Sequence, residues 1–83
     1  KYLGKLGEEL NECSTAIFRI IIQGINEREP VTGKPNKEWL EDEIADAMAN
    51  FRLVIDKFKL DNNRMYHREI RKIKLLKSWH DMA

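Results

Sequence analysis

Apolar residues recur at intervals of three and four along the first 25 positions, which is the period of an amphipathic α-helix. They are Leu3, Leu6, Leu10, Cys13, Ile17, Ile20 and Ile21. A second stripe with the same period consists of Leu40, Ile44, Ala47, Met48, Phe51, Val54, Ile55 and Phe58. The pattern predicts one helix over residues 2–25 and another over residues 37–59.

The segment between these stripes, residues 26–36, has no such period. It contains Pro30, Gly33 and Pro35, which disfavour continuous helix and predict a loop. Asn36 directly follows the second proline and is a candidate N-cap for the second helix.

A third helix is predicted after residue 60, where either Asp61 or Asn62 can serve as its N-cap. Its looser apolar face consists of Tyr66, Ile70, Ile73, Leu76 and Trp79. No segment alternates between apolar and polar residues as a strand does. The sequence therefore predicts an all-α fold, a small bundle of three main helices that forms a single domain over residues 1–83.

The length of 83 residues permits only a modest core, so we expect oligomerisation to complete the bundle. The chain opens with Lys1 instead of methionine, which indicates an N-terminally truncated fragment.

The sequence has neither a signal-peptide pattern nor an apolar run that would span a membrane. A single cysteine, Cys13, forms no internal disulfide. We expect a cytoplasmic protein.

Charge is nearly balanced overall, at +1, but it is segregated along the chain. Residues 38–46 carry five acids and no base, whereas residues 64–77 carry six bases and only Glu69 as an acid. Either a phosphate-binding surface lies beside a metal-binding one, or these are two solvated helix faces. The balanced total and the lack of interleaved aromatic residues disfavour a nucleic-acid-binding protein.

Two pairs of carboxylates lie at the margins of the first two stripes. Glu9 is paired with Glu12, and Glu43 with Asp46, each at the i, i+3 spacing that puts both side chains on one helix face. If the helices pack antiparallel, the four acids meet across a groove and repel one another unless a cation lies between them. Either pair alone is typical of a solvated helix edge; their joint position predicts a metal site.

The predicted donors are all oxygen atoms, which favours Mg²⁺, with Mn²⁺ as the alternative. His67 and His80 share no obvious face with the acids. Their position argues against a di-iron bundle, which uses Glu-x-x-His pairs, and against zinc, which prefers nitrogen and sulfur ligands.

The string Glu8-Glu9-Leu10-Asn11-Glu12, followed by Glu43-Ile44-Ala45-Asp46, resembles the E-E-x-x-E and E-x-x-D motifs of the MazG-like all-α nucleoside triphosphate pyrophosphohydrolases. That superfamily includes dimeric dUTPases and phosphoribosyl-ATP pyrophosphatases, and the similarity over residues 6–79 is to phage-type members. The resemblance implies that the four acids are catalytic and hold magnesium. It also implies that Glu8 assists a ligand or a water, that Asn50 points toward the nucleotide, and that the protein is a homodimer or homotetramer.

The expected activity is hydrolysis of nucleoside triphosphates, above all deoxynucleotides, to the monophosphate and pyrophosphate. Magnesium would neutralise charge on the phosphate oxygens and orient a water. Candidates for phosphate contacts are Lys5, Arg68, Arg71 and Lys74. The alternative is a non-catalytic helical module whose apolar stripes mediate self-association or partner binding.

Overall fold

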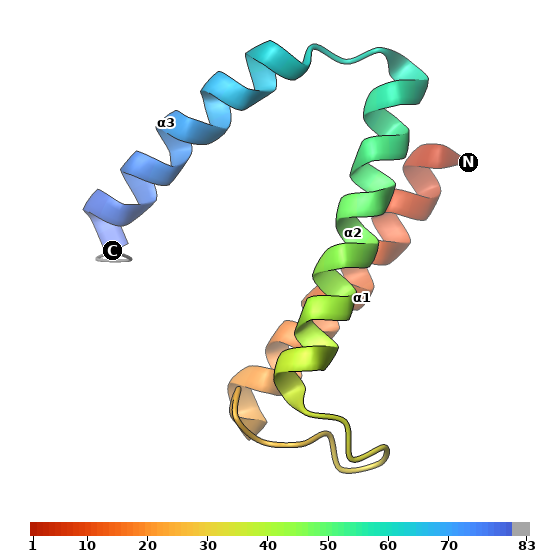
Figure 1. The fold of residues 1–83 in the computed structure, drawn as a ribbon, viewed down its shortest axis with the longest axis vertical. Coiled ribbons are helices and arrows are strands. Elements are labelled where there is room, and N and C mark those ends of the chain that lie inside the picture. Colours follow the sequence, from red (N-terminus) through yellow and green to blue (C-terminus); the bar gives the residue numbers. More distant parts are fainter. Residues whose placement is uncertain (81–83) are drawn as a thin grey trace.

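The structure is a computed structural model that describes residues 1–80 and contains three α-helices (Figure 1). They are α1 (Tyr2–Gln23), α2 (Asn36–Phe58) and α3 (Asn62–His80). No residue in this range belongs to a β-strand. The predicted all-α fold is confirmed, and α1 and α2 begin and end within two residues of the limits that their apolar periods indicated.

The helices α1 and α2 lie side by side and antiparallel, with the loop between them at one end (Figure 1). Their contact buries Ala16 and Ile20 of α1 together with Ala47 and Val54 of α2. Burial of an Ile or Val side chain contributes about 1.5–3 kcal/mol, so this small core gives the hairpin limited stability. Most of each apolar stripe lies outside the contact.

The loop over residues 24–35 is held by its own polar groups. Gly24 ends α1 at a φ of 108°, a backbone conformation that L residues rarely adopt. The carboxylate of Glu29 then accepts hydrogen bonds from the backbone N–H groups of Val31 and Thr32, at 3.0 and 2.7 Å. The Thr32 hydroxyl also donates to this carboxylate, at 2.7 Å, and this side-chain bond is the largest cause of the lowered pKa of Glu29. The two backbone bonds lower the pKa further.

The prediction that Asn36 caps α2 is wrong. Pro35 occupies the N-cap position, no side chain caps this end, and Asn36 is the first helical residue. Its side chain is fully buried, and its Nδ2 donates a hydrogen bond of 2.7 Å to the carbonyl oxygen of Gly24. The residue therefore ties the start of α2 to the end of α1.

The turn between α2 and α3 is formed by residues 59–61. Lys59 ends α2 in the left-handed conformation, at a φ of 52°, and the backbone N–H of Leu60 donates to the carbonyl of Ile55 at 3.0 Å. The Asp61 carboxylate accepts a 3.0 Å hydrogen bond from the backbone N–H of Arg64. Asp61 is thus the N-cap of α3, which confirms one of the two predicted alternatives, Asp61 and Asn62.

After this turn α3 diverges from the hairpin, and none of its residues is buried (Figure 1). The described chain is flat, with extents of 41 × 36 × 15 Å and a radius of gyration of 15.3 Å. A compact chain of this length has a radius of gyration of about 12 Å. A single copy therefore does not close into a compact bundle.

None of the helices within residues 1–80 combines the length and apolar character needed to cross a membrane.

Candidate metal centre

Three of the predicted ligands converge at the contact between α1 and α2. Glu9, Glu43 and Asp46 each offer a carboxylate oxygen, and these three oxygens lie within 4.8 Å of one another. Glu9 comes from α1, while Glu43 and Asp46 stand one turn apart on α2. The antiparallel packing of the two helices brings together acids that are more than 30 residues apart in the sequence.

Two of these carboxylates are only partly accessible to water. The Glu9 side chain is 12% exposed, and Glu43 is half-buried. One oxygen of each, Oε2 of Glu9 and Oε2 of Glu43, is buried and accepts no hydrogen bond from the described residues. A buried acceptor without a partner is costly. The arrangement is therefore unfavourable unless another group binds these oxygens.

The electrostatics of Glu43 reflect this position. Burial raises the pKa of its carboxyl above the ordinary value, and the negative charges of Glu12, Asp46 and Glu9 raise it further. The Trp39 side chain acts in the opposite direction as a hydrogen-bond donor. A positive ion at this point would favour the ionised form of Glu43.

Glu12, the fourth predicted ligand, lies at the periphery. It is exposed and does not belong to the group of three converging oxygens. Its negative charge is nevertheless the second cause, after burial, of the raised pKa of Glu43. The structure thus brings three of the four predicted acids together and leaves the fourth beside them.

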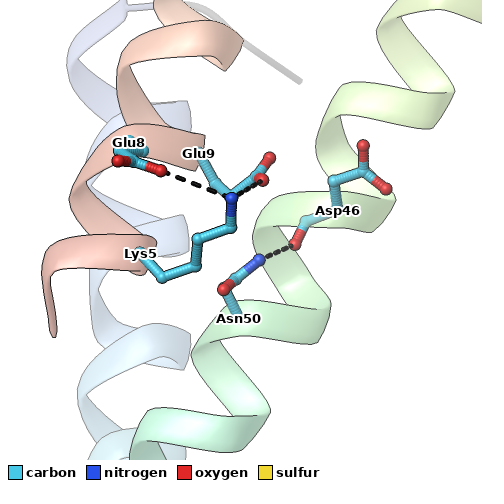
Figure 2. Close-up of polar contacts among 5 residues, drawn as sticks. All are labelled: Lys5, Glu8, Glu9, Asp46 and Asn50. Carbon is cyan, nitrogen blue, oxygen red and sulfur yellow. Dashed lines mark hydrogen bonds and ion pairs between the residues drawn. The ribbon is translucent and has the colours of Figure 1, made fainter. Parts of the chain in front are cut away.

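Lys5 already pairs with the acids of its own helix (Figure 2). Its Nζ lies 3.3 Å from Oε2 of Glu8 and 3.9 Å from Oε1 of Glu9. The hydrogen bond to Glu8 is the main reason why the pKa of Lys5 is raised. The side chain that we predicted as a phosphate contact therefore lies at the edge of the acidic group, and Glu8 binds this lysine.

Asn50 lies one turn beyond Asp46 on the same margin of α2. Its Nδ2 donates a 2.9 Å hydrogen bond to the backbone carbonyl of Asp46, as Figure 2 shows. In this arrangement the amide N–H is used within the helix, while the half-buried side chain stays next to the acids.

A hollow of about 260 Å³ lies beside Lys5 and Asn50, which contact Glu9 and the backbone of Asp46, but none of the three converging acids lines it. Its lining includes Lys5 and Asn50, two of the predicted substrate contacts, and also Lys1, Tyr2 and Leu53. Sequence analysis missed these last three residues. No motif marks them, and they meet only because the start of α1 packs beside the second half of α2.

The three basic candidates on the third helix, Arg68, Arg71 and Lys74, are not gathered with the acids. They belong to α3, which diverges from the α1–α2 hairpin (Figure 1).

Sequence analysis also did not connect Trp39 with Glu43. The available signal was their i, i+4 spacing on one helix, which places the two side chains in reach of each other.

Comparison with family models, with curated proteins and with solved structures found no match to this chain. The candidate site is therefore judged on its own geometry: three clustered carboxylates, two of them with a buried oxygen lacking a partner, beside a hollow that contains lysine, asparagine and tyrosine.

Proposed function

We propose that this chain hydrolyses nucleoside triphosphates to the monophosphate and pyrophosphate in a Mg²⁺-dependent reaction, in the manner of the MazG-like, phage-type enzymes that its motifs resemble. The observation that carries the proposal is the convergence of Glu9, Glu43 and Asp46 from two helices. Deoxynucleoside triphosphates are the proposed substrates, and we propose a cytoplasmic setting.

The donor set fits magnesium, with manganese as the alternative. All three converging groups are carboxylates, and the partnerless oxygens of Glu9 and Glu43 are the atoms that an ion would satisfy. Glu12 is near enough to act on the ionisation of Glu43, so it is the fourth proposed ligand. When bound, the ion would supply positive charge to the phosphate oxygens and a position for the attacking water.

The neighbouring hollow supports the binding of the nucleotide. Lys5 and Lys1 on its wall offer ammonium groups for phosphate oxygens, and Tyr2, Asn50 and Leu53 offer an aromatic ring, an amide and an apolar surface for the nucleoside. Lys5 would exchange its ion pair with Glu8 for one with phosphate. That exchange is inexpensive, because an exposed lysine–glutamate pair is worth about 0–1 kcal/mol.

A second candidate function is a non-catalytic helical module, and the apolar surface of the hairpin favours it. Phe18, Ile21 and Ile22 of α1 are 66, 71 and 83% exposed. Exposed apolar clusters of this kind mark association surfaces. The two functions are compatible, since we propose that the enzyme works as a homodimer or homotetramer.

The test is a screen of the common dNTPs with MgCl₂, with products separated by ion-exchange chromatography. We expect monophosphate and pyrophosphate. Glu43→Ala should abolish turnover, whereas the matched control Glu41→Ala, an exposed acid on the same helix, should keep it. Release of diphosphate and orthophosphate, or full activity of the Glu43 variant, would contradict the proposal.

Binding of the ion is tested separately by thermal unfolding in a magnesium series. A ligand that binds only the native state stabilises it by about 2.7 kcal/mol at a hundredfold excess over its dissociation constant. The melting temperature should rise with MgCl₂ in the wild type and in Glu41→Ala, and stay constant in Glu43→Ala. If the melting temperature of the wild type does not change with magnesium, the metal site is refuted and the non-catalytic helical module is the remaining candidate function.

A further inference from the structure

The basic side chains of α3 have no acidic partner within the part of the chain that the structure describes. The helix has six basic residues and one acidic residue, an excess of five positive charges. All ion pairs among the described residues lie within residues 5–42, so none of them involves a base of α3. The six bases are exposed, and their charges are available to a ligand.

Five of these bases share one side of α3, which we call the basic face. At about 100° per residue, its three arginines lie within about 60° of one another, and a lysine flanks them on either side. The basic face consists of Arg64, Arg68, Arg71, Lys72 and Lys74. It extends about 15 Å along the helix axis. A row of positive charges of this kind complements a row of phosphates.

The apolar residues of α3 lie on the other side of the helix. They are Met65, Ile70, Ile73 and Leu76. Self-association through this apolar side would therefore leave the basic face free. An anionic bilayer is a poor partner for it, because Glu69 lies between Met65 and Ile73, and a carboxylate among apolar residues opposes their burial in lipid.

The direction of α3 separates its bases from the acids of the hairpin. Residues 2–58 have eleven acidic and seven basic side chains, an excess of four negative charges that repels a polyanion. α3 diverges from them and buries no residue (Figure 1). Physiological salt largely screens exposed charges that are more than about 8 Å apart. The total of +1, which argued against a nucleic acid, therefore does not describe the charge that a ligand of α3 meets.

The distribution of aromatic residues favours a duplex over a single strand. Within residues 64–77 the one aromatic side chain of the Phe, Tyr or Trp type is Tyr66, which lies nearly opposite to Arg64 on the helix. Trp79, which is 69% exposed, lies beyond the last base. Proteins that bind single strands place aromatic rings along a basic groove so that successive bases stack on them. The basic face offers contacts to phosphates instead, and these suffice for a duplex.

The shape of α3 favours DNA over RNA. The diameter of a helix, about 10–12 Å, matches the width of about 12 Å of the major groove of B-DNA, whereas the major groove of an RNA duplex is narrow and deep. The 19 residues of α3 extend away from the hairpin (Figure 1). Leu75, which is 42% exposed, lies on the same side as Arg68 and suits a groove whose floor carries thymine methyl groups.

We propose that α3 docks in the major groove of duplex DNA and that its basic face holds phosphates of the DNA backbone. Binding is independent of the base sequence, because contacts from arginine and lysine to phosphates carry no base information. The activity goes beyond the hydrolysis of nucleotides. It uses a different helix from the acidic site, so either proposal can fail while the other stands.

The first experiment measures binding of the full chain to short fluorescent DNA duplexes of two unrelated sequences by anisotropy. We expect similar dissociation constants for both, of about 1–100 µM near physiological salt. The logarithm of the association constant should fall with the logarithm of the salt concentration at a slope of about −4 to −5, because each of the five bases that displaces a counterion contributes about −0.9. No binding at about 50 mM NaCl, or a slope near zero, would overturn the proposal.

The second experiment compares two variants that lose the same charge. Arg64→Gln combined with Arg71→Gln alters the basic face, while Arg19→Gln combined with Lys37→Gln removes two exposed bases of the hairpin. The first pair should weaken binding about tenfold or more at low salt and flatten the salt slope by about two. The control should stay within about twofold of the wild type. Equal losses in the two variants would show that net charge alone acts, which overturns a role for the basic face.

The third experiment compares possible occupants of the basic face. A single-stranded oligonucleotide, an RNA duplex and vesicles of phosphatidylcholine with phosphatidylserine should all bind more weakly than the DNA duplex. Tighter binding to any of the three would overturn docking in a DNA groove. Glu43→Ala, which removes an acid of the candidate metal centre, should bind DNA at least as tightly as the wild type. A loss of DNA binding in this variant would place the contact on the hairpin and would also overturn the proposal.

Discussion

The Nδ2 atom of Asn36 donates a hydrogen bond of 2.7 Å to the carbonyl oxygen of Gly24, and so joins the first residue of α2 to the residue that ends α1. Asn36 is fully buried, and its Nδ2 also lies 3.4 Å from Oε1 of Gln23. This clasp, together with the bond from the Asn36 backbone N–H to the carbonyl of Glu27, fixes the hairpin at its loop end.

Asn36→Ala should therefore destabilise the hairpin by about 0.5–1.5 kcal/mol, because the hydrogen bond from a fully buried side chain to the carbonyl of Gly24 is lost. Urea unfolding followed by circular dichroism measures the loss. The control Asn63→Ala removes an exposed asparagine in the first turn of α3 and should cost much less. Equal losses in the two variants would refute the role of the clasp.

Glu43→Gln should stabilise the protein in the absence of divalent ions. The substitution keeps the shape of the side chain and removes a charge that is partly buried and repelled by Glu12, Asp46 and Glu9. We expect a melting temperature in EDTA that is a few degrees above that of the wild type, and no further rise with magnesium. A lower melting temperature in EDTA would mean that the repulsion at this carboxylate is negligible.

The same carboxyl predicts a pH dependence with a definite sign. Because the pKa of Glu43 is raised in the folded state, its neutral form is favoured there; the associated stability is present below the ordinary value of 4.5 and is lost as the pH rises through the folded pKa. The gap in unfolding free energy between Glu43→Gln and the wild type, measured in EDTA, should thus widen from pH 4 toward pH 7. A gap independent of pH would contradict this assignment.

Lys5→Met should separate binding of the ion from binding of the phosphate. The ammonium of Lys5 lies 3.9 Å from Oε1 of Glu9 and partly offsets the negative charge of the acids. Its removal should lower the magnesium concentration at half-saturation and raise the KM for the nucleotide, since one phosphate contact is lost. The first effect is read by thermal shift and the second by steady-state kinetics. A variant with unchanged KM would exclude Lys5 from the substrate site.

Lys59→Gly should stabilise the turn between α2 and α3. Lys59 adopts a φ of 52°, where an L side chain is unfavourable by about 1–2 kcal/mol and glycine is not. We expect a gain of about 0.5–1 kcal/mol in urea unfolding. The comparison variant Lys57→Gly, inside the last turn of α2, should lose at least about as much, because glycine disfavours helix and the Lys57 ammonium no longer lies over the Tyr2 ring.

Several parts of the fold could be predicted because their cause is local. The period of the apolar residues defined the helices, and prolines and glycines defined the loop. Asp61 could be named as one of two candidate N-caps of α3, since its bond to the backbone of Arg64 spans only three residues. The role of Asn36 could not be predicted in this way. Pro35 occupies the N-cap position, and the group that the Asn36 side chain contacts, the carbonyl of Gly24, is distant in the sequence.

In the candidate site, too, some features have a local cause and others depend on contacts between distant residues. The sequence alone determined that Glu9 and Glu12, like Glu43 and Asp46, share a face of their own helix, because the 3.6-residue period fixes that relation. Only the tertiary structure decided that Glu9, Glu43 and Asp46 converge while Glu12 stays at the edge, and that α3 diverges from the hairpin. The rotation and stagger of packed helices, and the direction of a turn, depend on contacts between distant residues, which no local period encodes.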